Sequence, residues 1–105
     1  MSGVATAISV MVAAGTLMAG AIVIGEAGVM SQRAAGAADA AALAAADTVT
    51  GVIPGDPCAR AGDVAAANGA VVDSCVVDGA IASVTVHVRG GVLTAAARAR
   101  AGPPE

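Results

Sequence analysis

The sequence predicts an α+β protein, a long N-terminal α-helix followed by a small head, and three observations support this fold class. The first 25 residues carry no charge, and no proline interrupts the helix-compatible stretch before Pro54. The remaining residues are rich in valine and contain several glycine turn signals. We expect a long helix over residues 1–48, a small α/β head over 49–101 and a flexible tail over 102–105.

The N-terminal run predicts a membrane span. A spanning helix needs roughly 20 mostly apolar residues, and residues 4–25 meet this requirement. The Leu, Ile and Val residues in this stretch supply roughly −2 to −5 kcal/mol of insertion free energy, which Gly, Ser and Thr reduce. Residues 26–48 are mostly alanine, the best helix former, and are expected to continue the same helix as an extracytoplasmic stalk.

A secretory signal peptide is the competing interpretation of this run, with Ala19, Gly20 and Ala21 as a small-residue cleavage site. We favour the anchor, because no basic residue precedes Val4 and the apolar run is longer than a usual signal core. The signal interpretation leads to a different function. In that case the protein is a small secreted factor that is released from the membrane and binds a target-cell protein.

The charges and the chemically active residues predict a structural role. A net charge of −3 without a basic patch argues against nucleic-acid binding. We expect no enzyme activity and no cofactor, because no Ser/His/Asp or Cys/His order and no phosphate-binding loop is present. We expect no metal site, because Cys58, Cys75 and His87 are too few ligands for tetrahedral zinc.

The two cysteines predict one disulfide between Cys58 and Cys75, in preference to free or metal-binding thiols. An even cysteine count behind an export anchor is typical of an oxidising compartment. A head of about 55 residues without aromatic side chains also needs such a covalent link, because its apolar core is small. Closing this loop is expected to stabilise the head by roughly 3 kcal/mol.

Turn and cap residues predict the elements of the head. Asp56 is a suitable N-cap and Pro57 a suitable first residue for a helix of about eleven residues that ends at Asn68-Gly69. Asp78-Gly79 then predicts a β-hairpin between strands at 70–77 and 80–89.

The second of these strands is expected to be half-buried. Val84, Val86 and Val88 alternate with polar residues, so they share one face, which we expect to pack on a helix. Residues 92–101 are compatible with a third strand or a helix. The alternation of Arg98 and Arg100 with alanine favours an edge strand, whereas the alanine content favours a helix.

Several segments resemble a known family. Residues 32–46 are similar to the segment that follows the anchor in TadE-like and TadG-like proteins of Tad (Flp) pilus systems. The head resembles the actinobacterial TadE-like branch, which is encoded beside helicase and secretion genes. The matching head segments are Gly55-Asp56-Pro57-Cys58-Ala59-Arg60-Ala61, Ala65-Ala66-Ala67-Asn68-Gly69-Ala70, Ser74-Cys75, Val77-Asp78-Gly79 and Ala97-Arg98-Ala99-Arg100-Ala101-Gly102-Pro103.

This resemblance implies a minor pilin or pseudopilin, a single-pass protein of the cell membrane with an extracytoplasmic head. Its implied partners are other pilin subunits and pilus assembly platform proteins, and the pilus or the medium are further locations. Gly15 with Ala19 has the small-xxx-small spacing of close helix packing. Glu26 and Arg33 are expected to form a solvated boundary or, alternatively, to pair with charges on an adjacent subunit, and we favour the solvated boundary. The expected subunit-packing residues are Ile8, Val12, Gly15, Ala19, Ile22, Glu26, Arg33 and Asp39.

One part of the wider pilin pattern is not matched. Type IV prepilins carry a basic leader that is cut after a glycine, and they have Glu at the fifth mature position. If Gly3 marked that cut, the fifth position would be Ile8. The resemblance therefore does not extend to this processing signal.

Overall fold

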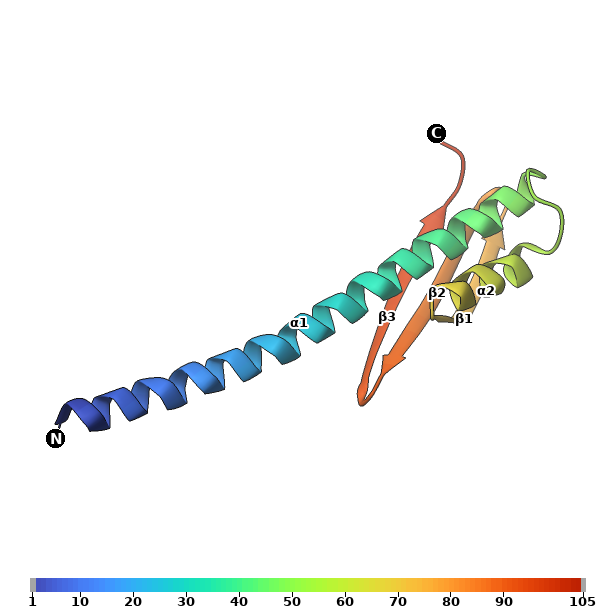
Figure 1. Ribbon diagram of the computed structural model, residues 1–105. Coiled ribbons are helices and arrows are strands. Elements are labelled where there is room, and N and C mark those ends of the chain that lie inside the picture. The colour runs from blue at the N-terminus through green and yellow to red at the C-terminus, as the bar shows by residue number, and fades with distance from the viewer. Residues whose placement is uncertain (1, 105) are drawn as a thin grey trace.

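The computed structural model describes the backbone of residues 2–104 and the side chains of residues 3–12, 25 and 27–104. Figure 1 shows a long helix that projects from a small head, and the molecule measures 76 × 29 × 17 Å. The α+β class and the three-stranded antiparallel sheet are confirmed. Over the described backbone the elements are α1 (Ser2–Val49), α2 (Pro57–Ala67), β1 (Val71–Asp78), β2 (Ile81–Gly90) and β3 (Leu93–Ala101).

Helix α1 is continuous over 48 residues, about 72 Å at the usual rise per residue. Its C-terminus is closed by a pair of backbone hydrogen bonds around Gly51, whose φ is +84°. The Val52 amide donates to the carbonyl of Asp47 at 2.9 Å, and the Gly51 amide donates to that of Thr48 at 3.2 Å. This Schellman arrangement needs the left-handed conformation that glycine adopts without steric cost.

Helix α2 begins and ends at the predicted residues. The Asp56 carboxylate accepts hydrogen bonds from the amides of Cys58 and Ala59, and Pro57 occupies the first turn. At the other end, Gly69 has a φ of +74° and the Ala70 amide donates to the Ala65 carbonyl at 2.9 Å. The N-cap, the proline and the terminating Asn68-Gly69 pair therefore act as the sequence predicts.

The strands form an antiparallel sheet in the order β1-β2-β3. Both turns lie one residue later than their sequence signals suggest, at Gly79-Ala80 and Gly91-Val92, because Asp78 pairs with Ile81 and Gly90 pairs with Leu93. The glycine stands first in each turn with φ near +60°, and the non-glycine residues of the described chain have negative φ. Glycine in the first of the two turn positions is typical of type II′ hairpins.

Residues 93–101 form a strand. The sequence is compatible with either a strand or a helix in this segment, and the structure has the strand. Strand β3 pairs with β2 along its whole length, from Leu93 opposite Gly90 to Ala101 opposite Ala82. The gain from these ladder hydrogen bonds outweighs the helix propensity of the alanines. The predicted alternation holds, since Arg98 and Arg100 are exposed while Ala99 between them is buried.

The core lies where α1 and α2 cover one face of the sheet (Figure 1). Val84 and Val86 of β2 are its largest fully buried side chains, as expected for the valine face. The helix contributes alanines spaced four and three residues apart, which form one stripe on its surface. The fully buried members of this stripe are Ala34, Ala38, Ala41 and Ala45.

Residues 30–48 of α1 therefore belong to the folded head. The sequence analysis expected residues 26–48 to form a stalk, but the structure packs most of this stretch against β2, β3 and α2. The reason is the side-chain size, because alanine lets the helix backbone approach the sheet closely. The charged residues Arg33, Asp39 and Asp47 are spaced so that they lie on one side of the helix, opposite the buried alanines, and this spacing is the available signal for a packed helix.

Because the helix lies so close to the sheet, we expect that a larger side chain in the buried alanine stripe destabilises the head. Ala41→Leu adds volume to a site with 0% exposure and should cost about 1 to 3 kcal/mol of unfolding free energy. Thermal unfolding of the full chain in mild detergent, followed by circular dichroism, measures this cost. Ala35→Leu makes the same change at an exposed position of α1 and should shift stability by less than about 0.5 kcal/mol. Equal effects of the two substitutions would contradict the packing.

Candidate functional site

The N-terminal half of α1 projects from the head (Figure 1). Every described side chain from residue 3 to residue 12 is exposed, and these side chains are mainly apolar. Among them Val4, Ile8, Val10 and Val12 are each at least 58% exposed, and Met11 is 74% exposed. Monomeric soluble proteins seldom expose contiguous apolar surface of this kind, so residues 3–12 are a candidate interaction surface.

The expected subunit-packing residues divide between the two halves of α1. Ile8 and Val12 are exposed on the projecting half, and Arg33 and Asp39 are exposed on the half that packs against the sheet. The remaining four expected residues lie outside the described side chains. These are Gly15, Ala19, Ile22 and Glu26.

The predicted membrane span covers residues 4–25. The side chains of residues 13–24 within it lie outside the described residues. Within the described part of the chain, no helix combines the length and the apolarity that a membrane crossing requires.

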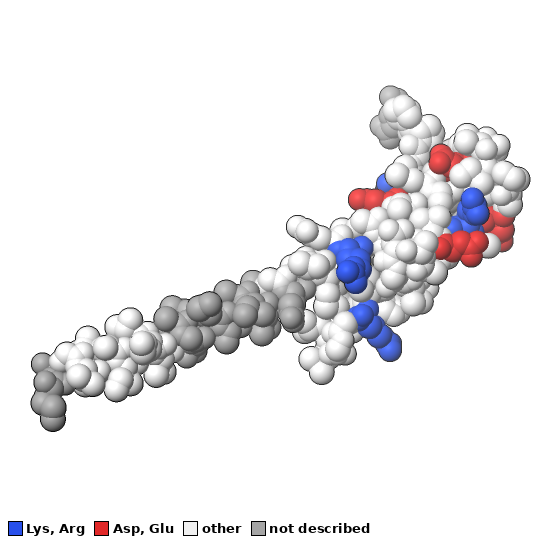
Figure 2. Space-filling view, in the orientation of Figure 1, with Lys and Arg blue, Asp and Glu red and all other residues white. Residues whose placement is uncertain are grey.

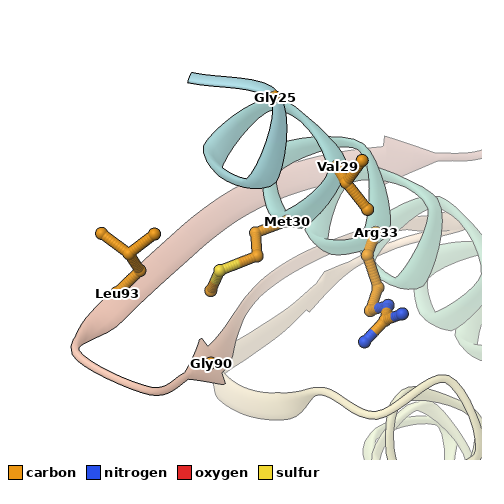
Figure 3. Close-up of a pocket in the computed structure, with 6 residues that line it drawn as sticks. All are labelled: Gly25, Val29, Met30, Arg33, Gly90 and Leu93. Carbon is orange, nitrogen blue, oxygen red and sulfur yellow. The ribbon is translucent and has the colours of Figure 1, made fainter. Parts of the chain in front are cut away.

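A groove lies at the neck, which we define as the region where α1 leaves the head (Figure 3). It has a volume of about 530 Å³, and Figure 3 shows Met30 between α1 and the β2–β3 hairpin. A Cβ atom on Gly90 would stand 3.1 Å from the Met30 sulfur, so glycine makes this approach possible. The residues that line this neck groove are Gly25, Val29, Met30, Arg33, Gly90 and Leu93.

The sequence analysis did not identify the neck groove. Met30 and Gly90 are 60 residues apart in the sequence, and only the antiparallel return of β2 brings them together. The one available signal is the Gly90-Gly91 pair, which indicates a turn but not what the turn contacts.

Charge is distributed unevenly along the head (Figure 2). On the face that Figure 2 shows, the described atoms near the neck include Lys or Arg atoms and no Asp or Glu atoms. At the neck, Arg33 lines the groove and Arg89 directly precedes Gly90. The opposite end of the head carries Asp47 in the last turn of α1, where it lies near the β1–β2 turn. Among the described side chains the neck therefore carries two arginines, and Glu26 lies in the same stretch of the sequence.

The face of the sheet away from the helices is mostly polar and contains a β-bulge. The register of β1 shifts between Val72 and Ser74, which places the unpaired Asp73 beside His87. The His87 Nδ1 atom lies 2.7 Å from the Asp73 carboxylate, and the two side chains are 19% and 45% exposed. Nothing in the sequence predicts this pair, because the bulge that brings Asp73 beside His87 depends on the pairing of β1 with β2. A pair this accessible to water contributes about 1 kcal/mol or less.

Metal ligands are scattered through the described part of the chain. Within it, no three His, Cys, Asp or Glu side chains lie close enough together to hold a metal ion.

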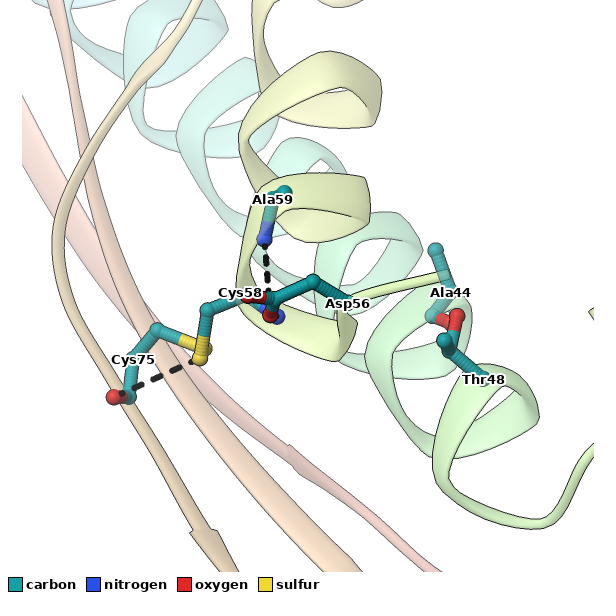
Figure 4. Close-up of a disulfide and its surroundings, with 6 residues drawn as sticks. All are labelled: Ala44, Thr48, Asp56, Cys58, Ala59 and Cys75. Carbon is teal, nitrogen blue, oxygen red and sulfur yellow. Dashed lines mark hydrogen bonds between the residues drawn. A yellow bond between two sulfur atoms is a disulfide. The ribbon is translucent and has the colours of Figure 1, made fainter. Parts of the chain in front are cut away.

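The predicted disulfide joins Cys58 in the first turn of α2 to Cys75 on β1 (Figure 4). The Cα atoms of the two cysteines are 5.8 Å apart, within the usual range for this bond. Figure 4 also shows the Cys58 sulfur close to the Cys75 carbonyl, at 3.6 Å. The bond fastens α2 to the edge strand β1, so it holds the second helix over the sheet.

The chain was compared with protein families, with curated proteins and with solved structures, and none of these matches it. The functional conclusion below therefore depends on the geometry and on the sequence features already described.

Loss of the disulfide should destabilise the head but leave α1 helical. Replacing both cysteines by serine removes a link across 17 residues and should lower the unfolding free energy by roughly 3 kcal/mol. Chemical denaturation of the full chain in mild detergent measures this loss, with the oxidised wild type as the reference. Exported protein should contain no thiol that can be alkylated. Two reactive thiols in exported protein, or an unchanged denaturation midpoint in the double variant, would contradict a structural disulfide.

Proposed function

We propose that this chain is a TadE-like minor pilin or pseudopilin, a structural subunit of a Tad/Flp type IV-like pilus or of its assembly machinery. Its N-terminal helix anchors it in the cell membrane in a single pass and then packs against the helices of other subunits. Its head lies outside the cytoplasm. One observation carries this proposal, namely that a single continuous helix exposes mainly apolar side chains over residues 3–12 and packs into a head over residues 30–48.

This exposed surface needs another apolar environment. Removing one large aliphatic side chain from water is worth about 1.5 to 3 kcal/mol, and several such side chains are exposed within the described residues 3–12. A lipid bilayer removes this surface from water, and so does a bundle of similar helices at the centre of a filament. A subunit can therefore move from membrane to filament without unfolding, because each environment covers the same apolar surface.

The packed half supports the same proposal. Residues 30–48 of α1 are held by the sheet and by α2, so the projecting half extends from a firmly folded base. Bending forces on the helix are then transmitted to the head, as a filament subunit requires. The disulfide that holds α2 to β1 is typical of proteins that function outside the cytoplasm, and it supports an extracytoplasmic head.

A charge in the projecting half tests the proposal. Val12→Asp costs roughly 3 kcal/mol of insertion free energy near the middle of the span, which offsets most of the gain from its aliphatic residues. In the bacterium that encodes the chain, wild-type protein should fractionate with membranes and with sheared filaments, and Val12→Asp should be lost from both. Val52→Asp makes the same change at a 74% exposed position in the α1–α2 loop and should behave like the wild type.

Two outcomes of this experiment contradict the proposal. One is a Val12→Asp variant that fractionates like the wild type. The other is mature protein in the medium whose N-terminus lies near Ala21 or Ala27, which would support the secreted factor instead. Sequencing of the N-terminus in each fraction distinguishes the second outcome from shedding of intact subunits.

A further inference from the structure

The β2–β3 turn is an apolar tip that lies beside the base of the projecting helix. Figure 1 shows that this turn points toward the same end of the molecule as the N-terminal half of α1. Val92 lies at the tip and is fully exposed, although contact between an aliphatic side chain and water is unfavourable. Leu93 follows it and is partly buried in the neck groove.

The tip is level with the end of the apolar half of α1. Met30 lies against Gly90, and the same groove includes Gly25 and Leu93. Gly25 is the last residue of the stretch that carries no charge. If this stretch lies in a bilayer, the tip is therefore placed at the boundary between the bilayer and water.

Two arginines flank the tip on opposite sides of the sheet. Arg33 lies on α1 and lines the neck groove, and the exposed Arg89 lies on the face of β2 away from the helices. Guanidinium groups bind phosphate oxygens through two parallel hydrogen bonds. An apolar tip between cations is the pattern of protein segments that lie in the headgroup region of a membrane.

We propose that the neck surface, which consists of Val29, Arg33, Arg89, Val92 and Leu93, docks on an anionic bilayer surface. In the docked state Val92 enters the headgroup region, while Arg33 and Arg89 bind lipid phosphates. This inference rests on the membrane anchor of the proposed function, and it adds a second contact that fixes the head against the membrane. The exposed Arg33 and Arg89 support a lipid partner, because guanidinium groups near a membrane surface are attracted to anionic headgroups.

Single tryptophans report this contact clearly, since the chain contains no Trp, Tyr or Phe. Full-length Val92→Trp is reconstituted into vesicles of phosphatidylglycerol and phosphatidylcholine, or of phosphatidylcholine alone. Brominated lipids then quench tryptophans in contact with the bilayer, and iodide quenches those in water. Val12→Trp reports the anchor, and Val52→Trp is the matched control at the far end of α1, since Val52 follows that end and is exposed.

The expected result is quenching of Val92→Trp by lipids brominated near the headgroup, in anionic vesicles and with a blue-shifted emission. Val52→Trp should be quenched by iodide only. Adding Arg33→Gln and Arg89→Gln should lower the ratio of docked to undocked heads by about fivefold for each arginine, and high salt should have the same effect.

Failure of this inference and failure of the anchor give different results. If Val12→Trp is quenched by lipid but Val92→Trp is as accessible to iodide as Val52→Trp, the docking is overturned and the anchor stands. If brominated lipids quench Val92→Trp equally in neutral and in anionic vesicles, the binding of lipid phosphates by the arginines is overturned. Shielding from iodide without quenching by lipid indicates a protein partner and also overturns the inference. If the protein does not float with vesicles and Val12→Trp is not quenched, both the anchor and the docking are overturned.

Discussion

Alanines of α1 pack against valines of β2, and this contact decides how the other elements are arranged. Because the fully buried side chains of α1 are those of alanines, α1 lies close to the sheet. Strand β3 then lies under the same helix with alanines on its inner face, and α2 covers the remaining strand β1. The disulfide holds α2 at this edge, where apolar burial alone is small.

The same contact sets where the packed part of α1 begins. Met30 is the first residue of α1 that packs on the core, whereas the described residues 3–12 are exposed and mainly apolar. In the proposed function, lipid or the helices of other subunits cover this exposed surface. Because α1 is continuous, no flexible linker separates this surface from the head. The neck, where the packed part begins, carries Arg33, Arg89 and the apolar turn.

Local signals in the sequence predict most of the fold. Asp56 and Gly69 mark the ends of α2, the alternating valines identify the inner face of β2, and the two cysteines pair as expected. Other features depend on contacts between distant residues. The strand at Leu93–Ala101 depends on pairing with β2, and the neck groove depends on the approach of Met30 to Gly90. The packed face of the alanine run is indicated only by the charged residues Arg33, Asp39 and Asp47, which lie on the opposite side of the helix.

The central claim is that α1 remains one unbroken helix while its first half is surrounded by apolar partners. Hydrogen exchange of backbone amides in the full chain, reconstituted in lipid nanodiscs, tests this claim most directly. The account predicts slow exchange without interruption from the projecting half into residues 30–48, since lipid protects the first half and the sheet protects the second. Exchange of residues 3–12 at the rate of an unstructured peptide, with protection that begins only near Met30, would contradict it.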